Sequence, residues 1–311
     1  MKMMHMLPED MQLANERRFA RAHIDGYITT FLQGEQDVCD AVAQGVQLLH
    51  DYAHQTYGYE SKNLRMEMVR ELDLEPIVWK IFIASAYAQI PEIFSSFTAK
   101  LAGLLGFDDK ADSIRTVAEM VAVLCETNVY DLVQNERYGT WKIQSNLELP
   151  EKLYRFVEQS SYLPPHVCQP PKLTSNKQAV RTTCEPESMI LNNNHHNGDI
   201  CLDALNIMNS VELCLNTAFL CTVEEEPNKF LDDKDAVIQW NLFKRDSHEM
   251  YKLMVMQGNR FHLLHKVDKR GRSYAQGYHI STQGAPYKKA TVDLFNKHEV
   301  TGVPAHLRIK P

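Results

Sequence analysis

The residues best suited to chemistry in this sequence lie close together, between Lys266 and Lys289. This segment, KVDKRGRSYAQGYHISTQGAPYKK, contains the pattern D-x-R-G-R-x-Y, formed by Asp268, Arg270, Gly271, Arg272 and Tyr274. Two guanidinium groups separated by a glycine can present planar, bidentate donors to phosphate, and the missing side chain lets the backbone approach closely. Tyr274 adds an aromatic face, and Asp268 can hold one arginine in place. The pattern predicts a phosphate-binding loop; the alternative is an exposed turn with surface charges.

Charge is distributed unevenly along the 311 residues. The whole chain carries −7, but Tyr251 to Pro311 contains eleven Lys or Arg and three acids, a net charge of +8, which leaves −15 for the preceding 250 residues. A basic segment of this kind is typical of phosphate binding, whereas a uniformly acidic chain is repelled by nucleic acid. The alternative interpretation is a solvated basic tail.

Neither a metal site nor a membrane span is indicated by the sequence. The seven cysteines form no C-x-x-C pair, so we expect reduced thiols. The spacings of four candidate zinc ligands match no familiar set: Cys184, His195, His196 and Cys201. The apolar stretch from Ile77 to Ile90 is shorter than the ~20 residues of a membrane span. No secretory signal is visible either, so we expect a cytoplasmic protein that binds no metal itself.

The apolar patterns predict a mainly α protein with a small β component. In the first 127 residues apolar side chains recur at spacings of three and four, which favours a helical block. Pro76 is placed to open a helix that runs from Ile77 to Ile90. From Val129 to Ile143 apolar residues alternate on either side of a turn, which predicts a β-hairpin. The remaining expected elements are an irregular proline-rich stretch at 163–171 and helices at 150–159, from 199 or 203 to 219, and through 240–253.

The D-x-R-G-R-x-Y pattern resembles the motif at the entrance to the palm of phage and mitochondrial single-subunit RNA polymerases. In that family the motif is followed by Q-G, a lysine and an apolar stretch. Here the corresponding residues are Gln283, Gly284, Lys288, Lys289, Val292, Leu294 and Phe295. Four earlier segments resemble the same family in the same order: LEPIVWKIFIASAYAQI from Leu74, IRTVAEMVAVLCETN from Ile114, LPPHVCQPPK from Leu163 and VELCLNTAF from Val211.

The resemblance implies roles for individual residues. The arginines would contact phosphates of the template and the RNA–DNA hybrid, and the tyrosine would line the sugar–base face. The implied nucleic-acid-binding residues are Arg270, Arg272, Tyr274, Gln283 and Lys289, with Lys288 as the alternate for Lys289. The residues that support the motif are Asp268, Gly271 and Gly284. The predicted hairpin falls at the place of the family's intercalating hairpin, where Tyr138 and Trp141 either stack on an upstream base pair or pack inward.

The resemblance also implies an enzyme divided between two chains. RNA extension uses two metal ions about 3.5–4 Å apart, held by carboxylates, and in the family these carboxylates lie far beyond the motif. Only 37 residues follow Tyr274, and their acids, Asp293 and Glu299, sit in no matching motif. We therefore expect no catalytic residue in this chain and Mg²⁺ held by a partner chain. Heterodimeric RNA polymerases of Schitoviridae-type phages have this arrangement.

The implied architecture has four parts. These are a helical polymerase N-terminal domain at 1–160 with its hairpin near 129–143, a connecting segment and helix at 161–220, a reduced thumb-like region at 221–264, and the start of the palm at 265–311. The implied partners are a larger subunit with palm and fingers, template DNA, the RNA transcript and a phage-encoded recruiting factor, for middle-gene transcription in the cytoplasm of an infected bacterium. The candidates for the subunit interface are Val292, Leu294, Phe295, Val300 and Val303; the alternative is that they fold back on this chain's own helices. The alternatives are a helical nucleic-acid-binding transcription regulator without polymerase assembly, and a scaffold with a basic tail.

Overall fold

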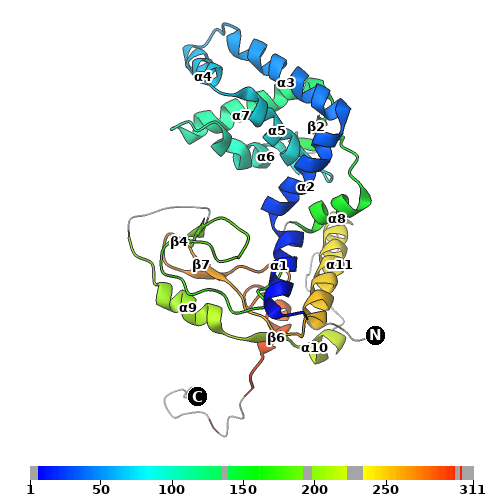
Figure 1. Ribbon diagram of the computed structural model, residues 1–311, viewed down its shortest axis with the longest axis vertical. Helices are drawn as coiled ribbons and strands as arrows, with labels where there is room; N and C mark the ends of the chain where they lie inside the picture. Colours follow the sequence, from blue (N-terminus) through cyan, green and yellow to red (C-terminus); the bar gives the residue numbers. More distant parts are fainter. Residues whose placement is uncertain are drawn as a thin grey trace. The chain divides into compact units, whose positions relative to one another are not determined.

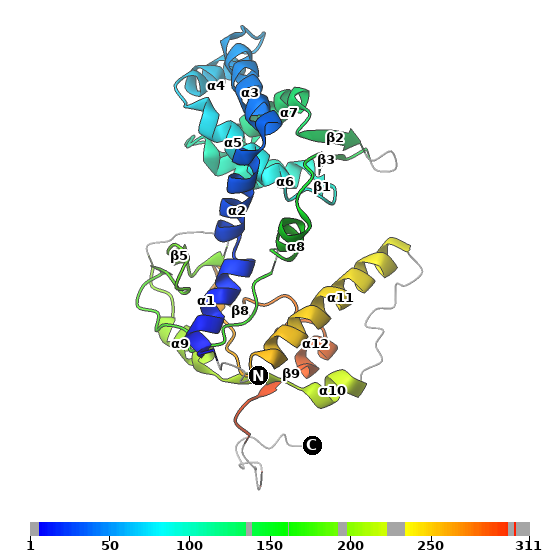
Figure 2. The same ribbon diagram turned by 45° about the vertical axis from the view of Figure 1, so that its right-hand side comes forward.

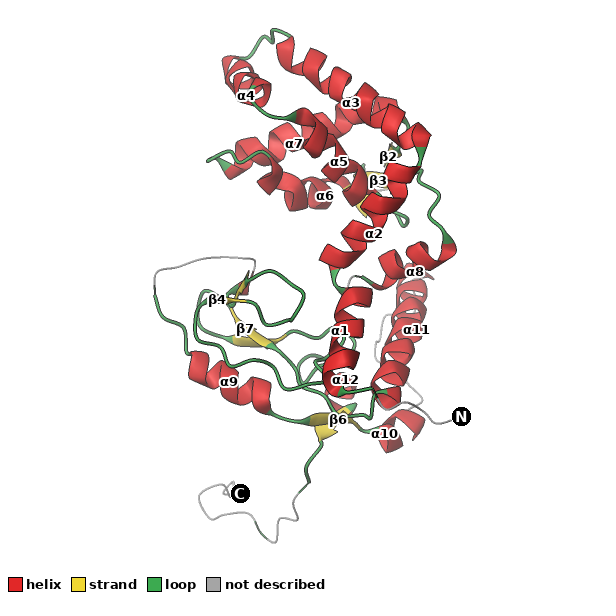
Figure 3. Ribbon diagram, viewed as in Figure 1, coloured by secondary structure: helices red, strands yellow, loops and turns green. Residues whose placement is uncertain are grey.

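A computed structural model describes residues 6–134, 139–160, 162–191, 198–222, 234–297 and Gly302. It confirms a mainly α protein with small sheets, since helices dominate and the strands are short (Figure 3). The chain divides into two compact units. We call Arg21–Glu158 the inserted unit, and Met1–Ala20 together with Gln159–Pro311 the flanking unit. The compact unit starts at Arg21, whereas the expected domain at 1–160 starts at the first residue, because the first helix packs with the C-terminal part of the chain.

The inserted unit consists mainly of helices, with one three-stranded sheet (Figure 1). Its helices are α2 (Arg21–Gly34), α3 (Gln36–His54), α4 (Glu60–Arg70), α5 (Leu74–Ser85), α6 (Phe94–Leu101), α7 (Lys110–Leu124) and α8 (Glu151–Gln159), with 3-10 turns at Ala102–Leu104 and Cys125–Thr127. Its strands are β1 (Glu92–Ile93), β2 (Tyr130–Gln134) and β3 (Trp141–Ser145). α3 contacts α2, α4, α5 and α7 and so lies at the centre of the unit.

The core of the inserted unit is apolar and tightly packed around α3. Leu49 on α3 and Phe82 on α5 are fully buried within one cluster. At Gly45, a Cβ would lie 2.8 Å from Leu124 Cδ2 and 3.1 Å from Val78 Cγ1. Because those distances leave no room for a side chain, glycine is what lets α5 and α7 approach α3 this closely.

α5 is shorter than the apolar run predicted. Asp73 caps its start by accepting a hydrogen bond from the backbone N–H of Glu75, and the helix ends at Ser85 instead of Ile90. Ala86 and Ala88 remain fully buried after the helix has ended. The carbonyl of Ala88 accepts a hydrogen bond from the N–H of Ser145 at 2.9 Å. The apolar run continues past Ser85 because a buried turn, and not further helix, joins α5 to the sheet.

β2 and β3 pair antiparallel where the alternation predicted a hairpin, with Leu132 opposite Ile143 and Gln134 opposite Trp141. The connection between them, including Tyr138, lies outside the described residues. β1, which the sequence did not predict, pairs with the other edge of β3, and Figure 2 shows this sheet beside α6. The inward face carries Tyr130 and Ile143, both fully buried.

In its described residues, the flanking unit combines helices with three two-stranded ribbons. Its helices are α1 (Pro8–Phe19), α9 (Leu202–Ser210), α10 (Thr217–Thr222), α11 (Lys234–Met256) and α12 (Pro286–Ala290). The ribbons are β4 (Lys177–Gln178) with β5 (Glu187–Ser188), β6 (Leu213–Leu215) with β9 (Val292–Leu294), and β7 (His265–Val267) with β8 (Ser273–Ala275). Across the described ranges of both units, no helix has the length and apolar character needed to cross a membrane.

The single helix expected up to residue 219 is wrong, because α9, β6 and α10 replace it. Leu213 exchanges two backbone hydrogen bonds with Phe261, at 2.8 and 2.9 Å. The side-chain amide of Asn259 accepts from the N–H of Leu215 and donates to its carbonyl. These long-range partners and β9 hold the segment as a strand, which overrides its helical apolar spacing.

α1 joins the flanking unit through buried polar side chains. The carboxylate of Glu16 accepts hydrogen bonds from the backbone N–H groups of Thr182 and Thr183 and from the Thr183 hydroxyl. Asn15 and Gln257 exchange two amide hydrogen bonds at 2.8 and 2.9 Å. Gln12 completes this set by accepting a hydrogen bond from the backbone N–H of Val167. Each buried polar side chain on this face is thus hydrogen-bonded to a residue more than 150 positions away.

Candidate nucleic-acid interface

The D-x-R-G-R motif forms the turn between β7 and β8. These strands pair antiparallel with Val267 opposite Ser273. The N–H of Asp268 donates to the carbonyl of Arg272 at 2.9 Å, and the N–H of Gly271 donates to the carbonyl of Asp268 at 3.0 Å. Gly271 has φ +79°, a conformation that glycine adopts without the steric cost other residues carry. The motif is therefore an ordered hairpin turn in which glycine has a backbone role.

Asp268 organises this turn. Its Oδ1 accepts hydrogen bonds from the backbone N–H groups of Arg270 and Arg272, and its Oδ2 accepts from Arg272 Nε at 2.6 Å. The Arg272 side chain and the backbone donors lower the pKa of Asp268 to about 2. Asp268 is consequently ionised at neutral pH, and its negative charge fixes both the backbone of the turn and the guanidinium of Arg272.

The two arginines differ in how firmly they are held. Arg272 forms a charge-assisted hydrogen bond to Asp268 and lies over the ring of Tyr274, with 5.8 Å between guanidinium carbon and ring centroid. Arg270 Nε is 3.8 Å from Asp268 Oδ2, too long for a hydrogen bond. Their side chains are 74% (Arg270) and 54% (Arg272) exposed. Both can reach an external phosphate, Arg272 from a fixed position and Arg270 from a more adaptable one.

Gln283 has a structural partner inside the hairpin. Its Oε1 accepts from the N–H of Ala275 and its Nε2 donates to the carbonyl of Ser273, both at 3.1 Å. The side-chain amide therefore satisfies the outer edge of β8 as a neighbouring strand would. Gly284 follows with φ +106°. These contacts indicate that Gln283 stabilises the β7–β8 hairpin that carries the motif.

The two lysines of α12 have different surroundings. Lys288 Nζ donates to the carbonyl of Tyr278 at 2.7 Å and lies 4.7 Å from the ring centroid of Phe243 and 4.6 Å from that of Tyr278. Burial lowers the pKa of Lys288. Lys289 is exposed. Of the pair, Lys289 has the side chain that can meet an external phosphate, and Lys288 joins α12 to an aromatic cluster.

The hairpin residue Trp141 belongs to the inserted unit and is half exposed. Its strand partner Gln134 is also exposed, whereas Ile143, two residues further along the same face, is fully buried. The indole therefore lies at the end of the hairpin next to the connection between β2 and β3, outside the core.

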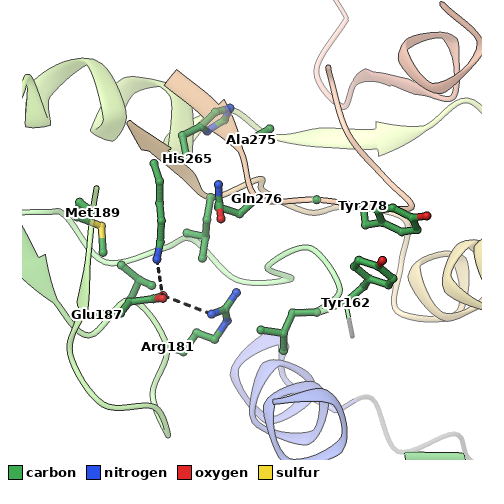
Figure 4. Close-up of a pocket in the computed structure, with 13 residues that line it drawn as sticks. Tyr162, Arg181, Glu187, Met189, His265, Ala275, Gln276 and Tyr278 are labelled. Carbon is green, nitrogen blue, oxygen red and sulfur yellow. Dashed lines mark hydrogen bonds and ion pairs between the residues drawn. The ribbon is translucent and has the colours of Figure 1, made fainter. Parts of the chain in front are cut away.

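A cavity of about 370 Å³ lies beside the β7–β8 ribbon, and no pattern in the sequence indicated it. Lys266 Nζ is 2.7 Å from Glu187 Oε2, and Arg181 is 3.5 Å from Glu187 Oε1. Figure 4 shows Arg181 and Glu187 at one side of the cavity and Tyr162 and Tyr278 at the other. Lys266 is 79 positions from Glu187 in the sequence, so no local spacing could have predicted that these charged residues meet.

No cluster of three or more His, Cys, Asp or Glu side chains able to hold a metal ion occurs among the described residues. Of the four candidate zinc ligands, His195 and His196 lie outside those residues. The chemistry that the described interface supports is electrostatic: two exposed guanidinium groups on an ordered turn, with an aromatic ring beside one of them.

Comparison with known proteins adds no assignment, because no protein-family model and no curated protein matches this sequence.

Proposed function

We propose that this chain is a non-catalytic subunit of a DNA-directed RNA polymerase of the single-subunit family. It would bind template DNA and the RNA–DNA hybrid and complete the active site of a larger partner chain. The observation that carries the proposal is the Asp268–Arg272 turn, whose exposed arginines are organised by one carboxylate and one positive-φ glycine. Its sequence is the part of the chain that most resembles that family.

The geometry of the turn supports binding to nucleic-acid phosphates. Arginine on an ordered turn loses less side-chain freedom on binding than arginine on a flexible tail, and its fork can contact two phosphate oxygens at once. Lys289 adds a further exposed cation in the segment that follows. Such contacts carry no base specificity, which suits a protein that must hold any template sequence.

The proposal leaves catalysis to the partner. The palm carboxylates and the two Mg²⁺ ions would belong to the larger subunit, and this chain would supply positioning and charge compensation. Promoter choice would depend on a separate recruiting factor. The assembly would act in the cytoplasm of an infected bacterium, on middle genes.

Elements of the flanking unit can be assigned to polymerase parts under this proposal. The long helix α11 would correspond to the reduced thumb, and β7 to β9 would form the entrance to the palm. Leu294 and Phe295 are about half exposed at the end of β9, which suits an interface with the larger subunit. Val300 and Val303, also expected there, lie outside the described residues.

The test is transcription from a premelted template by this chain, by a palm-containing partner and by both together. We expect RNA only from both chains, and about 10- to 100-fold less with Arg272→Ala, because a charge-assisted hydrogen bond is lost. Arg155→Ala is the matched control, since Arg155 is also exposed and paired with an acid four residues away. Full synthesis by the partner alone would contradict the proposal and leave a nucleic-acid-binding regulator as the better account.

A further inference from the structure

The cavity beside β7 and β8 has the features of a ligand site distinct from the arginine turn. Its volume of about 370 Å³ lies in the range of small-molecule pockets. The residues that line it include Arg181, Glu187, Lys266, Tyr162, Tyr278 and Gln276. The turn arginines, Arg270 and Arg272, do not line it.

The charged end of the cavity carries an excess of positive charge. Arg181 and Lys266 both face the one carboxylate of Glu187, and their side chains are only 12% and 14% exposed. Glu187 is the only carboxylate among the described residues that line the cavity. Glu16, whose carboxylate accepts hydrogen bonds from Gln12, Thr182 and Thr183, does not line it. Two largely buried cations that share one anion favour a further anion beside them.

The opposite end of the cavity is aromatic. Tyr162 and Tyr278 stack with 3.7 Å between ring centroids and an interplanar angle of 8°, and both rings line the cavity. Gln276 lies between the two ends in Figure 4 and can hydrogen-bond to a polar ring edge. A ligand that fills this space would combine a flat heteroaromatic ring with an anionic group a few bonds away.

We propose that this cavity binds one nucleotide unit, with its phosphate beside Arg181 and Lys266 and its base against the Tyr162–Tyr278 pair. Base–aromatic stacking tolerates any base, so we expect little discrimination among the four. The unit can be a free nucleoside monophosphate or one nucleotide of a single strand. The site stands on its own residues and does not depend on assembly with a polymerase subunit.

The test is isothermal titration calorimetry on the full chain with three probes: nucleoside monophosphates, inorganic phosphate and a five-residue oligothymidylate. We expect saturable binding of one monophosphate per chain with a Kd of about 1 mM or tighter, and weaker binding of inorganic phosphate. A much lower Kd for the oligonucleotide would identify a single strand as the source of the nucleotide. Equal Kd values would identify the free nucleotide.

Two variants probe the two ends of the cavity. Arg181→Gln should weaken the binding of monophosphate about tenfold or more. Tyr162→Leu should weaken the binding of monophosphate but leave the binding of inorganic phosphate unchanged. Arg245→Gln is the matched control, because Arg245 lies in the same unit, pairs with Asp246 and does not line the cavity. If Arg181→Gln fails to fold, Tyr162→Leu, at a position that is 38% exposed, still decides the assignment.

Absence of saturable binding would overturn the proposal, as would equal affinity for inorganic phosphate together with no effect of Tyr162→Leu. Arg272→Ala separates this site from the proposed polymerase function. It should reduce transcription by the assembled enzyme and leave monophosphate affinity unchanged, so either assignment can fail without the other.

Discussion

The two units of this chain achieve stability by different means. In the inserted unit, fully buried side chains such as Ile28, Leu49 and Phe82 form one apolar cluster. In the flanking unit the apolar residues fall into two smaller clusters, and polar side chains such as Glu16 and Gln283 reach backbone groups elsewhere in the fold. The inserted unit therefore depends on the sum of many apolar contacts, whereas the attachment of α1 in the flanking unit depends on particular hydrogen bonds.

The largest expected effect is in the inserted unit. Phe82→Ala should lower its free energy of unfolding by about 3–5 kcal/mol, because a large side chain leaves a cavity in the core. Pulsed hydrogen exchange at increasing urea concentration, followed for peptides of each unit, measures this change. Leu64→Ala, at an exposed position on α4, is the control. An equal loss in peptides of the flanking unit would show that the two units unfold as one, against the comparison.

Glu16→Ala tests the flanking unit in the same experiment. We expect the free energy of unfolding of the flanking unit to fall by about 2–4 kcal/mol, because the backbone N–H groups of Thr182 and Thr183 lose a charged acceptor in a buried position. Glu9→Ala changes an exposed glutamate on the same helix and should have little effect. A change below 0.5 kcal/mol, about that of a neutral surface substitution, would mean that α1 contributes little to this unit.

Acid should weaken the flanking unit more than the inserted one. Burial lowers the pKa of His166 and of His279 to about 4, while a histidine in the unfolded chain has a pKa of about 6.5. Below pH 6.5 the unfolded state therefore binds protons that the folded state does not, so stability is lost as the pH falls from about 6.5 to about 4.

Between pH 7 and pH 5 we expect the free energy of unfolding of the flanking unit to fall by an amount on the order of 2 kcal/mol. The Glu16 carboxyl adds a second step at lower pH: burial raises its pKa, but hydrogen bonds from Gln12, Thr183 and Thr182 outweigh burial and hold it below its ordinary value. Urea midpoints of each unit at the two pH values measure the effect. His279→Asn should reduce it, and a pH response confined to the inserted unit would contradict the explanation.

The smallest expected effect on stability comes from Asp268→Asn. The carboxylate organises only its own exposed turn, so the urea midpoints of both units should stay unchanged. Hydrogen exchange at the N–H groups of Arg270 and Arg272 should accelerate, because both lose a charged acceptor. Binding to a single strand should weaken in parallel. Unchanged exchange at both amides would show that the backbone holds the turn without Asp268.

Local features of the fold were predictable from the sequence, and long-range polar contacts were not. The spacing of Val38, Val42 and Leu49 predicts the buried face of α3, and all three are in the core. The five residues of the arginine turn are neighbours in sequence, so their joint placement could be expected. By contrast, Leu215 continues the helical spacing of Leu205 and Val211 but lies in a strand. The partners that hold this strand, Phe261 and Asn259, are more than forty residues away in the sequence.

The candidate site shows the same limit. Residue types predicted that Gln283 and Lys288 would face a ligand, but the direction of a side chain depends on what surrounds it. Gln283 is hydrogen-bonded to the edge of β8, and Lys288 to the carbonyl of Tyr278. The pairing of Lys266 with Glu187 spans 79 positions, and no pattern in the sequence marks it.

The position of α1 has a consequence for folding during synthesis. Asn15 emerges from the ribosome 242 residues before its partner Gln257, which at about 5–20 residues per second is a delay of about 10–50 s. Three of the four buried side chains on α1, those of Gln12, Asn15 and Glu16, are polar. A nascent α1 thus exposes little apolar surface while the inserted unit is translated, which lowers the risk of aggregation until the rest of the flanking unit has been made.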